Sequence, residues 1–156
     1  MSSVNPELAR VEPATLGDLN ALVELTMELF RVEPDFHPDR FRQEHGLRLI
    51  LEQPNRGRIF VVRTDHKIFG MANLLITIST AMGGFALVLE DVIIHPDHRG
   101  HGYGTLLMNH VLTFAREKAF KRITLLTDKT EVDSQRFFSR FGFEFSSMVP
   151  MRLLLD

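Results

Sequence analysis

The sequence predicts an α/β fold: a mixed β-sheet with helices on both faces. Three observations support this prediction. Apolar residues recur at helical spacing in several segments, and runs rich in β-branched residues lie between those segments. The run 85–94 is mostly apolar on both of its faces, which is typical of a central strand covered on each side. With 156 residues and 44% hydrophobic side chains, residues 1–156 are expected to form a single domain.

The first third of the chain predicts one strand and two helices. Residues 8–14 are expected to form an edge strand, since Pro13 would be costly in a central one. Thr15 and Asp18 have the spacing of a capping box and precede apolar residues at helical spacing up to about residue 31. A second, weaker helix is expected over 39–53.

The rest of the chain predicts strands and helices in alternation. The expected strands cover 59–63, 68–78, 85–94, 123–127, 143–146 and 150–155, and the expected helices cover 103–119 and 132–141. Gly142 is expected to end the last helix. The predicted order is therefore β-α-α-β-β-β-α-β-α-β-β.

Composition excludes several classes of function. No cysteine is present, so disulfides, thiolate metal sites and cysteine nucleophiles are absent. A net charge of -2 argues against binding to nucleic acid. No run approaches the roughly 20 apolar residues that cross a bilayer, and the first residues lack a secretion signal. We therefore expect a cytoplasmic protein that binds no membrane.

The segment 95–105 is the most informative part of the sequence. A predicted strand ends there, and a turn with Gly100, Gly102 and Gly104 leads directly into a helix. Glycine lets a ligand approach the backbone, and free N–H groups at a helix start favour an anion, so a phosphate or pyrophosphate site is expected. The spacing matches neither a P-loop nor the Rossmann fingerprint. A tight connection without a ligand is the alternative.

Four segments in order resemble the GCN5-related N-acetyltransferase (GNAT) superfamily. Arg99-x-x-Gly102-x-Gly104 is similar to its acetyl-CoA signature, and the segment 90–96 looks like its fourth strand. The segments 10–19 and 137–143 are similar to its opening and its C-terminal motif. The resemblance implies a fold of about seven strands and four helices, in which the fourth and fifth strands splay apart around acetyl-CoA.

The resemblance also implies which residues bind acetyl-CoA, without any metal. The backbone of Val92, Ile93 and Ile94 would pair with the pantetheine arm. The N–H groups of the turn would hold the pyrophosphate, with Arg99 bracing the turn or facing the phosphates; the turn residues are Gly100, His101, Gly102, Tyr103, Gly104 and Thr105. A metal site at the three histidines of 95–101 is disfavoured, because an irregular loop gives them no common face.

Glu90 is the candidate catalytic base. It interrupts an apolar face of a central strand, where desolvation is expected to raise the pKa of its carboxyl group. Strict alternation places Asp91 on the opposite face, where a structural role is expected. The family's usual general acid is a tyrosine where this chain has Phe138, and its frequent CoA-binding asparagine is replaced by Glu131.

The acceptor is expected to be a primary amine of a small molecule. The resemblance places the loop with Glu33, Asp35 and His37 at the acceptor pocket, where acidic groups suit a cation. The predicted function is therefore direct acetyl transfer from acetyl-CoA to this amine in a ternary complex. A non-catalytic acyl-CoA sensor and an acetyltransferase for protein N-termini or lysines are the alternatives. The resemblance also makes a homodimer plausible.

Overall fold

The computed structural model describes residues 8–32 and 37–156. The chain divides into two compact units, Met1–Leu126 and Thr127–Asp156. The expected single domain stays a prediction, and the two units are described separately. The larger unit contains all five strands found among the described residues, and the smaller one contains the last helix.

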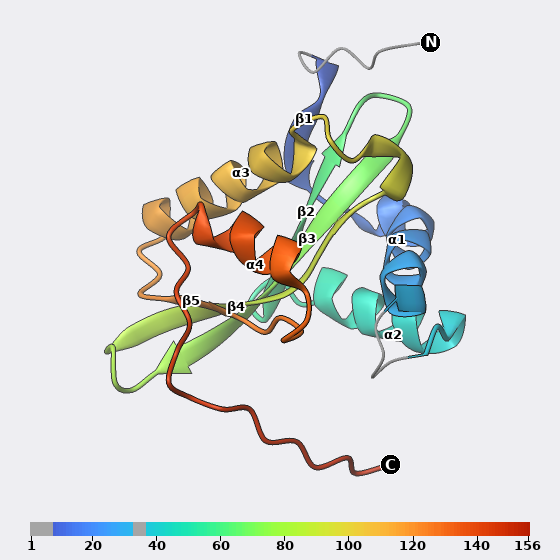
Figure 1. The fold of residues 1–156 in the computed structure, drawn as a ribbon. Helices are drawn as coiled ribbons and strands as arrows, with labels where there is room; N and C mark the ends of the chain where they lie inside the picture. Colours follow the sequence, from blue (N-terminus) through green and yellow to red (C-terminus); the bar gives the residue numbers. More distant parts are fainter. Residues whose placement is uncertain (1–7, 33–36) are drawn as a thin grey trace. The chain divides into compact units, whose positions relative to one another are not determined.

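The larger unit is built on one mixed sheet in the order β1-β2-β3-β4-β5 (Figure 1). The first three pairings are antiparallel, whereas β5 runs parallel to β4. The strands are β1 (Arg10–Pro13), β2 (Gly57–Arg63), β3 (Ile68–Ser79), β4 (Gly84–Ile94) and β5 (Ile123–Leu125). The predicted α/β class and mixed sheet are confirmed.

Helices cover both faces of this sheet, with α1 and α2 on one side and α3 on the other (Figure 1). They are α1 (Leu19–Val32), α2 (Arg40–Leu51) and α3 (Tyr103–Glu117). Short 3-10 turns, η2 (Leu16–Asp18) and η3 (Pro96–His98), precede α1 and α3. The capping box forms as expected, because the Thr15 backbone N–H donates to Asp18 Oδ2 at 2.9 Å.

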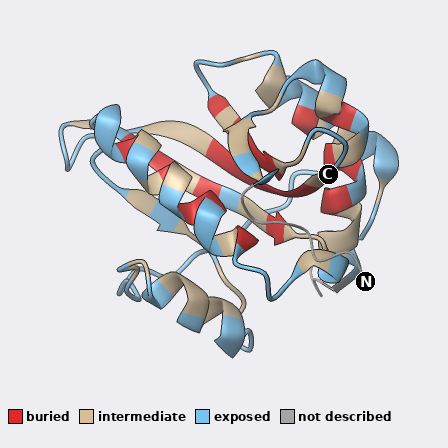
Figure 2. Cartoon of the chain, turned by 90° about the horizontal axis from the view of Figure 1, so that it is seen from above, coloured by how far each residue is buried: buried red, intermediate tan, exposed pale blue. Residues whose placement is uncertain are grey.

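Two apolar layers hold the helices to the sheet, and both are visible as buried segments in Figure 2. On the first face, alternate side chains of the central strands pack with Leu22 and Val23 of α1 and with Leu47 of α2. On the second face, the Phe60 ring meets His110 and Phe114 of α3 edge to face. These contacts hold α1, α2 and α3 against the strands that carry the candidate site.

The smaller unit differs from the prediction. It contains α4 (Val132–Ser139), and Gly142 follows it at φ 95° as the expected helix end. The expected strands 143–146 and 150–155 are wrong: neither segment is in a strand, so the observed count is five strands and not about seven. A strand needs a hydrogen-bonded partner, and the apolar side chains of 150–155, such as Met151 and Leu155 at 97% and 88% exposed, bury little surface.

Candidate functional site

The glycine turn lies between the end of β4 and the start of α3. Gly100 and Gly102 have φ angles of 82° and 83°, in the left-handed region that favours glycine. A Cβ atom built on either residue would have no neighbour within 4 Å. The backbone of the turn is therefore open on the side where a ligand would approach.

The same turn carries a run of unused donors. Among the described residues, none of the six backbone N–H groups from Gly100 to Thr105 donates a hydrogen bond, and the first helical bond runs from Leu106 N–H to Gly102 O at 3.0 Å. No side chain caps the start of α3. Free N–H groups at the positive end of a helix dipole form an anion site, and their number suits a diphosphate.

Backbone and side-chain hydrogen bonds hold this turn in place. The His95 backbone N–H donates to Phe69 O at 2.7 Å, which ties the end of β4 to β3. The Asp97 N–H donates to His95 Nδ1 at 3.2 Å. Arg99 Nε donates to Ile94 O at 3.0 Å, so this side chain braces the turn, one of the two roles expected for it.

Beside the turn, β4 loses its neighbour on the β5 side. The β5 pairing covers only Leu87, Val88 and Leu89, although β4 continues to Ile94. Because His95 N–H points to β3, the alternate peptide groups of Val92 and Ile94 point toward the opposite edge. An extended ligand could hydrogen-bond to these groups. The side chain of Ile93, by contrast, is buried in the α1/α2 core.

A cavity of about 260 Å³ opens on the α1/α2 face of the sheet. Its walls come from both helices and from the middle of β3 and β4. The lining residues are Thr26, Phe30, Arg42, Gln43, Gly46, Leu47, Ile50, Asn73, Leu75, Glu90 and Asp91. A small molecule with polar and apolar parts fits this mixture.

A β-bulge brings two acidic residues to this cavity. Asp91 is opposite Asn73 and Leu89 is opposite Leu74, so Glu90 is the extra residue of a bulge on β4. The prediction that Asp91 lies on the opposite face from Glu90 is wrong, because the extra residue shifts the alternation and both line the cavity. The burial expected for Glu90 is also wrong, since this residue is exposed.

Asp91 is a cavity-lining carboxyl group whose pKa is shifted by its surroundings. Burial raises its pKa above the ordinary value, and the hydrogen bond from Asn73 opposes this change. Asn73 Nδ2 donates to Asp91 Oδ2 at 3.0 Å. Asn73 is 3% exposed, and its Oδ1 has no hydrogen-bond partner among the described residues.

Sequence reasoning placed the acceptor site at the loop that contains Glu33, Asp35 and His37, which the structure describes only in part. Glu33 and Asp35 lie outside the described residues, and His37 is exposed and does not line the cavity. It missed Asn73, Thr26 and the α2 residues Arg42 and Gln43. One signal was available: Asn73 interrupts the apolar run of β3, and a polar residue inside a central strand requires a reason.

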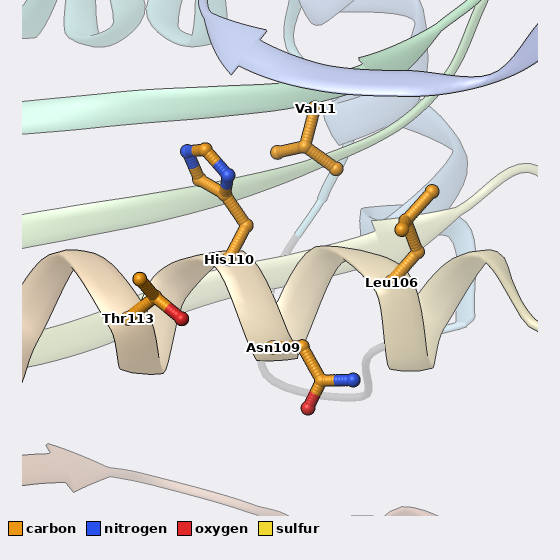
Figure 3. Close-up of a pocket in the computed structure, with 5 residues that line it drawn as sticks. All are labelled: Val11, Leu106, Asn109, His110 and Thr113. Carbon is orange, nitrogen blue, oxygen red and sulfur yellow. The ribbon is translucent and has the colours of Figure 1, made fainter.

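A second cavity, of about 250 Å³, lies between β1 and α3 (Figure 3). Val11 approaches it from the strand, Leu106 and His110 point from the helix toward the strand, and Asn109 points away. It contains no carboxylate and is lined by none of the predicted site residues. The acidic cavity on the other face is therefore the better candidate for chemistry on an amine.

Phe138 lies in the smaller unit, within its own aromatic cluster. Its ring meets Phe137 at 5.2 Å and Phe143 at 5.8 Å, both edge to face. Glu131, just before α4, is exposed. Among the described residues, no group of three or more His, Asp or Glu side chains could hold a metal ion. No described helix is both long and apolar enough to cross a membrane.

An open glycine turn with unused N–H groups, a strand edge left free beyond Leu89 and an acidic cavity are features expected of a fold that binds acyl-CoA. The model of the acetyltransferase (GNAT) family matches residues 19–143. The chain therefore belongs to the GNAT family, as the sequence motifs indicated.

Individual relatives agree with this family. Streptothricin acetyltransferase of Streptomyces lavendulae is 32% identical over 92 residues, which are 58% of this chain and 47% of that protein. A possible acetyltransferase of Clostridium difficile 630 has a TM-score of 0.86 at 14% identity, covering 96% of this chain and 99% of its own. An aminoglycoside N-acetyltransferase, AAC(6')-Iy, in complex with CoA has a TM-score of 0.77 at 18% identity, covering 95% of both chains.

Those two structures show that the fold is shared. The chain spans between 34% and 57% of the lengths of the curated relatives that it matches.

Proposed function

We propose that this protein transfers the acetyl group of acetyl-CoA to a primary amine of a small molecule. The observation that carries the proposal is the run of six unused N–H groups in the glycine turn, next to a strand whose pairing with β5 ends at Leu89. The chain has no cysteine, so no cysteine thiol can carry the acetyl group, and this supports direct transfer in a ternary complex.

The residues present fit acetyl-CoA as a cosubstrate. In the proposed complex the N–H groups of Gly100 to Thr105 receive the diphosphate, and the peptide groups around Ile93, those of Val92 and Ile94, pair with the two amides of the pantetheine arm. Arg99 keeps the turn in shape through Ile94 O. Acetyl-CoA supplies an activated acyl thioester, and the protein supplies its orientation.

The amine must lose a proton before it attacks, since an alkyl ammonium group has a pKa of about 10. We propose Glu90 as a proton acceptor in this reaction. Its carboxylate lines the cavity and is exposed, so it can take up a proton, directly or through water, and release it to solvent. The leaving thiol has a pKa of about 8.5 and departs without a strong acid, which suits a chain with Phe138 in place of the usual tyrosine.

The acceptor is proposed to be a small cationic amine. Two carboxylates line a cavity of about 260 Å³, which is too small for a folded protein surface and large enough for one end of a small molecule. The printed names of two relatives, streptothricin acetyltransferase and aminoglycoside N-acetyltransferase, also point to small molecules. Glu33, Asp35 and His37 stay proposed acceptor contacts, and a homodimer and a cytoplasmic location stay predictions.

Binding of acyl-CoA without turnover is the second candidate. Phe138 favours it, because phenylalanine cannot protonate a leaving thiolate. The two candidates share the CoA site and differ only in whether a thiol is released.

The test has two stages. First, acetyl-CoA at 100 times its Kd should stabilise the folded protein by about 2.7 kcal/mol, measured by thermal or urea unfolding. Second, thiol release is followed with polyamines, aminoglycosides, aminophosphonates and peptides. Release with a free amine supports the proposed enzyme, and release only with peptides identifies a protein acetyltransferase. Stabilisation without release identifies the non-catalytic binder, and no stabilisation refutes both.

A further inference from the structure

Asn73 is a buried polar side chain that the fold itself does not require. It lies on central strand β3 at 3% exposure, and its Oδ1 has no partner among the described residues. A buried acceptor without a hydrogen bond costs about 1–3 kcal/mol. An apolar residue of similar size would avoid this cost, so a reason for asparagine must be found in what it contacts.

The contact of Asn73 is Asp91. Its Nδ2 donates to Asp91 Oδ2 at 3.0 Å across the β3–β4 pairing, directly beside the bulge. This bond fixes one carboxylate oxygen, and one oxygen can still accept a hydrogen bond from a ligand. Both residues line the same cavity. Because strands of a sheet hold their side chains precisely, the pair forms a rigid acceptor at the floor of the cavity.

The electrostatic surroundings of Asp91 favour a cationic ligand. Apart from Asp91 itself, two charged groups line the cavity: the acidic Glu90 on β4 and the basic Arg42 on α2. The lining residues from β3 and α1 carry no charge. The Arg42 side chain is 84% exposed and lies 3.5 Å from Asp39, so its charge is directed to solvent and to that partner. Burial raises the pKa of Asp91, which makes its carboxylate a better proton acceptor than an ordinary aspartate.

We propose that Asp91 binds the ammonium group of the acceptor and accepts its proton, and that Asn73 is the residue that positions Asp91. This inference rests on the proposed function and deepens it: the substrate class is a primary alkylammonium compound. The exposed Glu90, proposed above as a proton acceptor, then receives this proton from Asp91 and passes it to solvent.

The Asp91 carboxylate removes one proton from the ammonium group and leaves a neutral amine. The nitrogen lone pair forms a C–N bond with the thioester carbonyl carbon, and the C–S bond breaks with its electron pair on sulfur. The second proton leaves the nitrogen and neutralises the thiolate. The proton on Asp91 returns to solvent through Glu90.

A first experiment needs no knowledge of the natural acceptor. The full chain is labelled with carboxyl-13C aspartate, and the Asp91 resonance is assigned by its loss in Asp91→Asn. We expect this resonance to titrate above the ordinary aspartate range, and at still higher pH in Asn73→Leu, where the bond that lowers the pKa of Asp91 is absent. Butylammonium chloride should shift the resonance, whereas butanol and sodium chloride should not.

A second experiment uses acetyl transfer to whichever amine of the panel releases thiol fastest. Asp91→Asn should lower kcat/KM by on the order of 100-fold and raise KM. The acidic limb of the kcat/KM profile should move to higher pH in Asn73→Leu and further in Asn73→Asp, which adds a like charge. Thr77→Val is the matched control: it removes a hydroxyl from the same face of β3, bonded to Ala86 O at 3.5 Å, and should leave the limb in place.

The outcomes separate this inference from the proposed function. An Asp91 resonance that responds neither to Asn73→Leu nor to butylammonium overturns the inference, even when the wild type releases thiol. An acidic limb that disappears in Glu90→Gln and persists in Asp91→Asn also overturns it. Absence of thiol release from every amine refutes the proposed function, and the response of Asp91 to butylammonium would then still identify an ammonium site.

Discussion

The rings of Phe69 and Tyr103 are stacked, with centroids 5.1 Å apart and 14° between their planes. Phe69 belongs to β3 and Tyr103 is the first residue of α3, so this contact holds the start of the helix against the sheet. The carbonyl of Phe69 also receives the His95 N–H. Phe69 therefore fixes both ends of the glycine turn.

Phe69→Leu should weaken acetyl-CoA binding as well as the fold. Loss of the ring should cost about 1–2 kcal/mol of unfolding free energy, because a buried contact of 3% exposure is only partly refilled. Calorimetric titration should show a several-fold higher Kd for acetyl-CoA, because the turn loses its anchor. Phe114→Leu removes a ring that packs on Phe60, away from the turn, and should lower stability without changing this Kd.

Gly102→Ala tests the turn itself. The substitution meets no clash, since a Cβ there has no neighbour within 4 Å, but a φ of 83° should cost about 1 kcal/mol. Relaxation of this strain would turn the N–H groups away from a diphosphate, so acetyl-CoA should bind at least tenfold more weakly. Gly83→Ala carries the same strain at φ 73° in the β3–β4 turn. An equal loss of acetyl-CoA affinity in Gly102→Ala and Gly83→Ala would show that the turn between β4 and α3 does not hold the diphosphate.

His98 should make the turn sensitive to acid. It packs 4.3 Å from the Phe69 ring, and burial, followed by the positive charge of Lys67, lowers its pKa. Between the lowered folded pKa of His98 and the unfolded value of about 6.5, the folded state therefore binds fewer protons than the unfolded state. Stability falls as the pH drops from about 6.5 through the folded pKa.

Urea unfolding from about pH 7.5 to about pH 5 measures this effect, because this range extends to both sides of the ordinary histidine pKa of about 6.5. In His98→Gln the pH dependence should be flatter, although the lost ring contact lowers stability throughout. His66→Gln, in the exposed turn between β2 and β3, is the control and should keep the wild-type slope. A wild-type slope in His98→Gln would remove His98 from the explanation.

The features that were predicted correctly from the sequence depend on interactions between residues close together in the chain. The Thr15–Asp18 capping box depends on residues three apart, and the glycine turn depends on the conformations that Gly100 and Gly102 allow. Such features are encoded within a few residues. The mixed sheet followed from the order of these local elements, whereas the coenzyme site stays a prediction based on the turn.

The bulge at Glu90 is not encoded locally. Whether a residue is extra depends on the register with β3, which no pattern within β4 reveals. A shift of one position moved Asp91 to the cavity and made the face assignment wrong. The C-terminal strands failed for a related reason, since the apolar run from Leu153 to Leu155 shows that a strand is possible but does not provide a partner.

Asp91→Asn should increase stability while it removes activity. The folded pKa of Asp91 is raised above the unfolded value of about 3.9, so the charged carboxylate opposes folding. This penalty is absent below about pH 3.9, grows as the pH rises through the folded pKa, and is fully present above it. Asparagine carries no charge, and its carbonyl oxygen can still accept the hydrogen bond from Asn73.

The unfolding free energy of Asp91→Asn minus that of the wild type should therefore rise from about pH 4 and level off above the folded pKa of Asp91. Urea unfolding across this range measures the difference, and acetyl-CoA titration checks that the coenzyme site is intact. Asp65→Asn, on an exposed carboxylate that pairs with Arg10, should lower stability slightly if at all. A variant at Asp91 that is less stable than the wild type at pH 7 would show that the carboxylate serves the fold, whereas a more stable one shows that stability is given up for the chemistry of an amine.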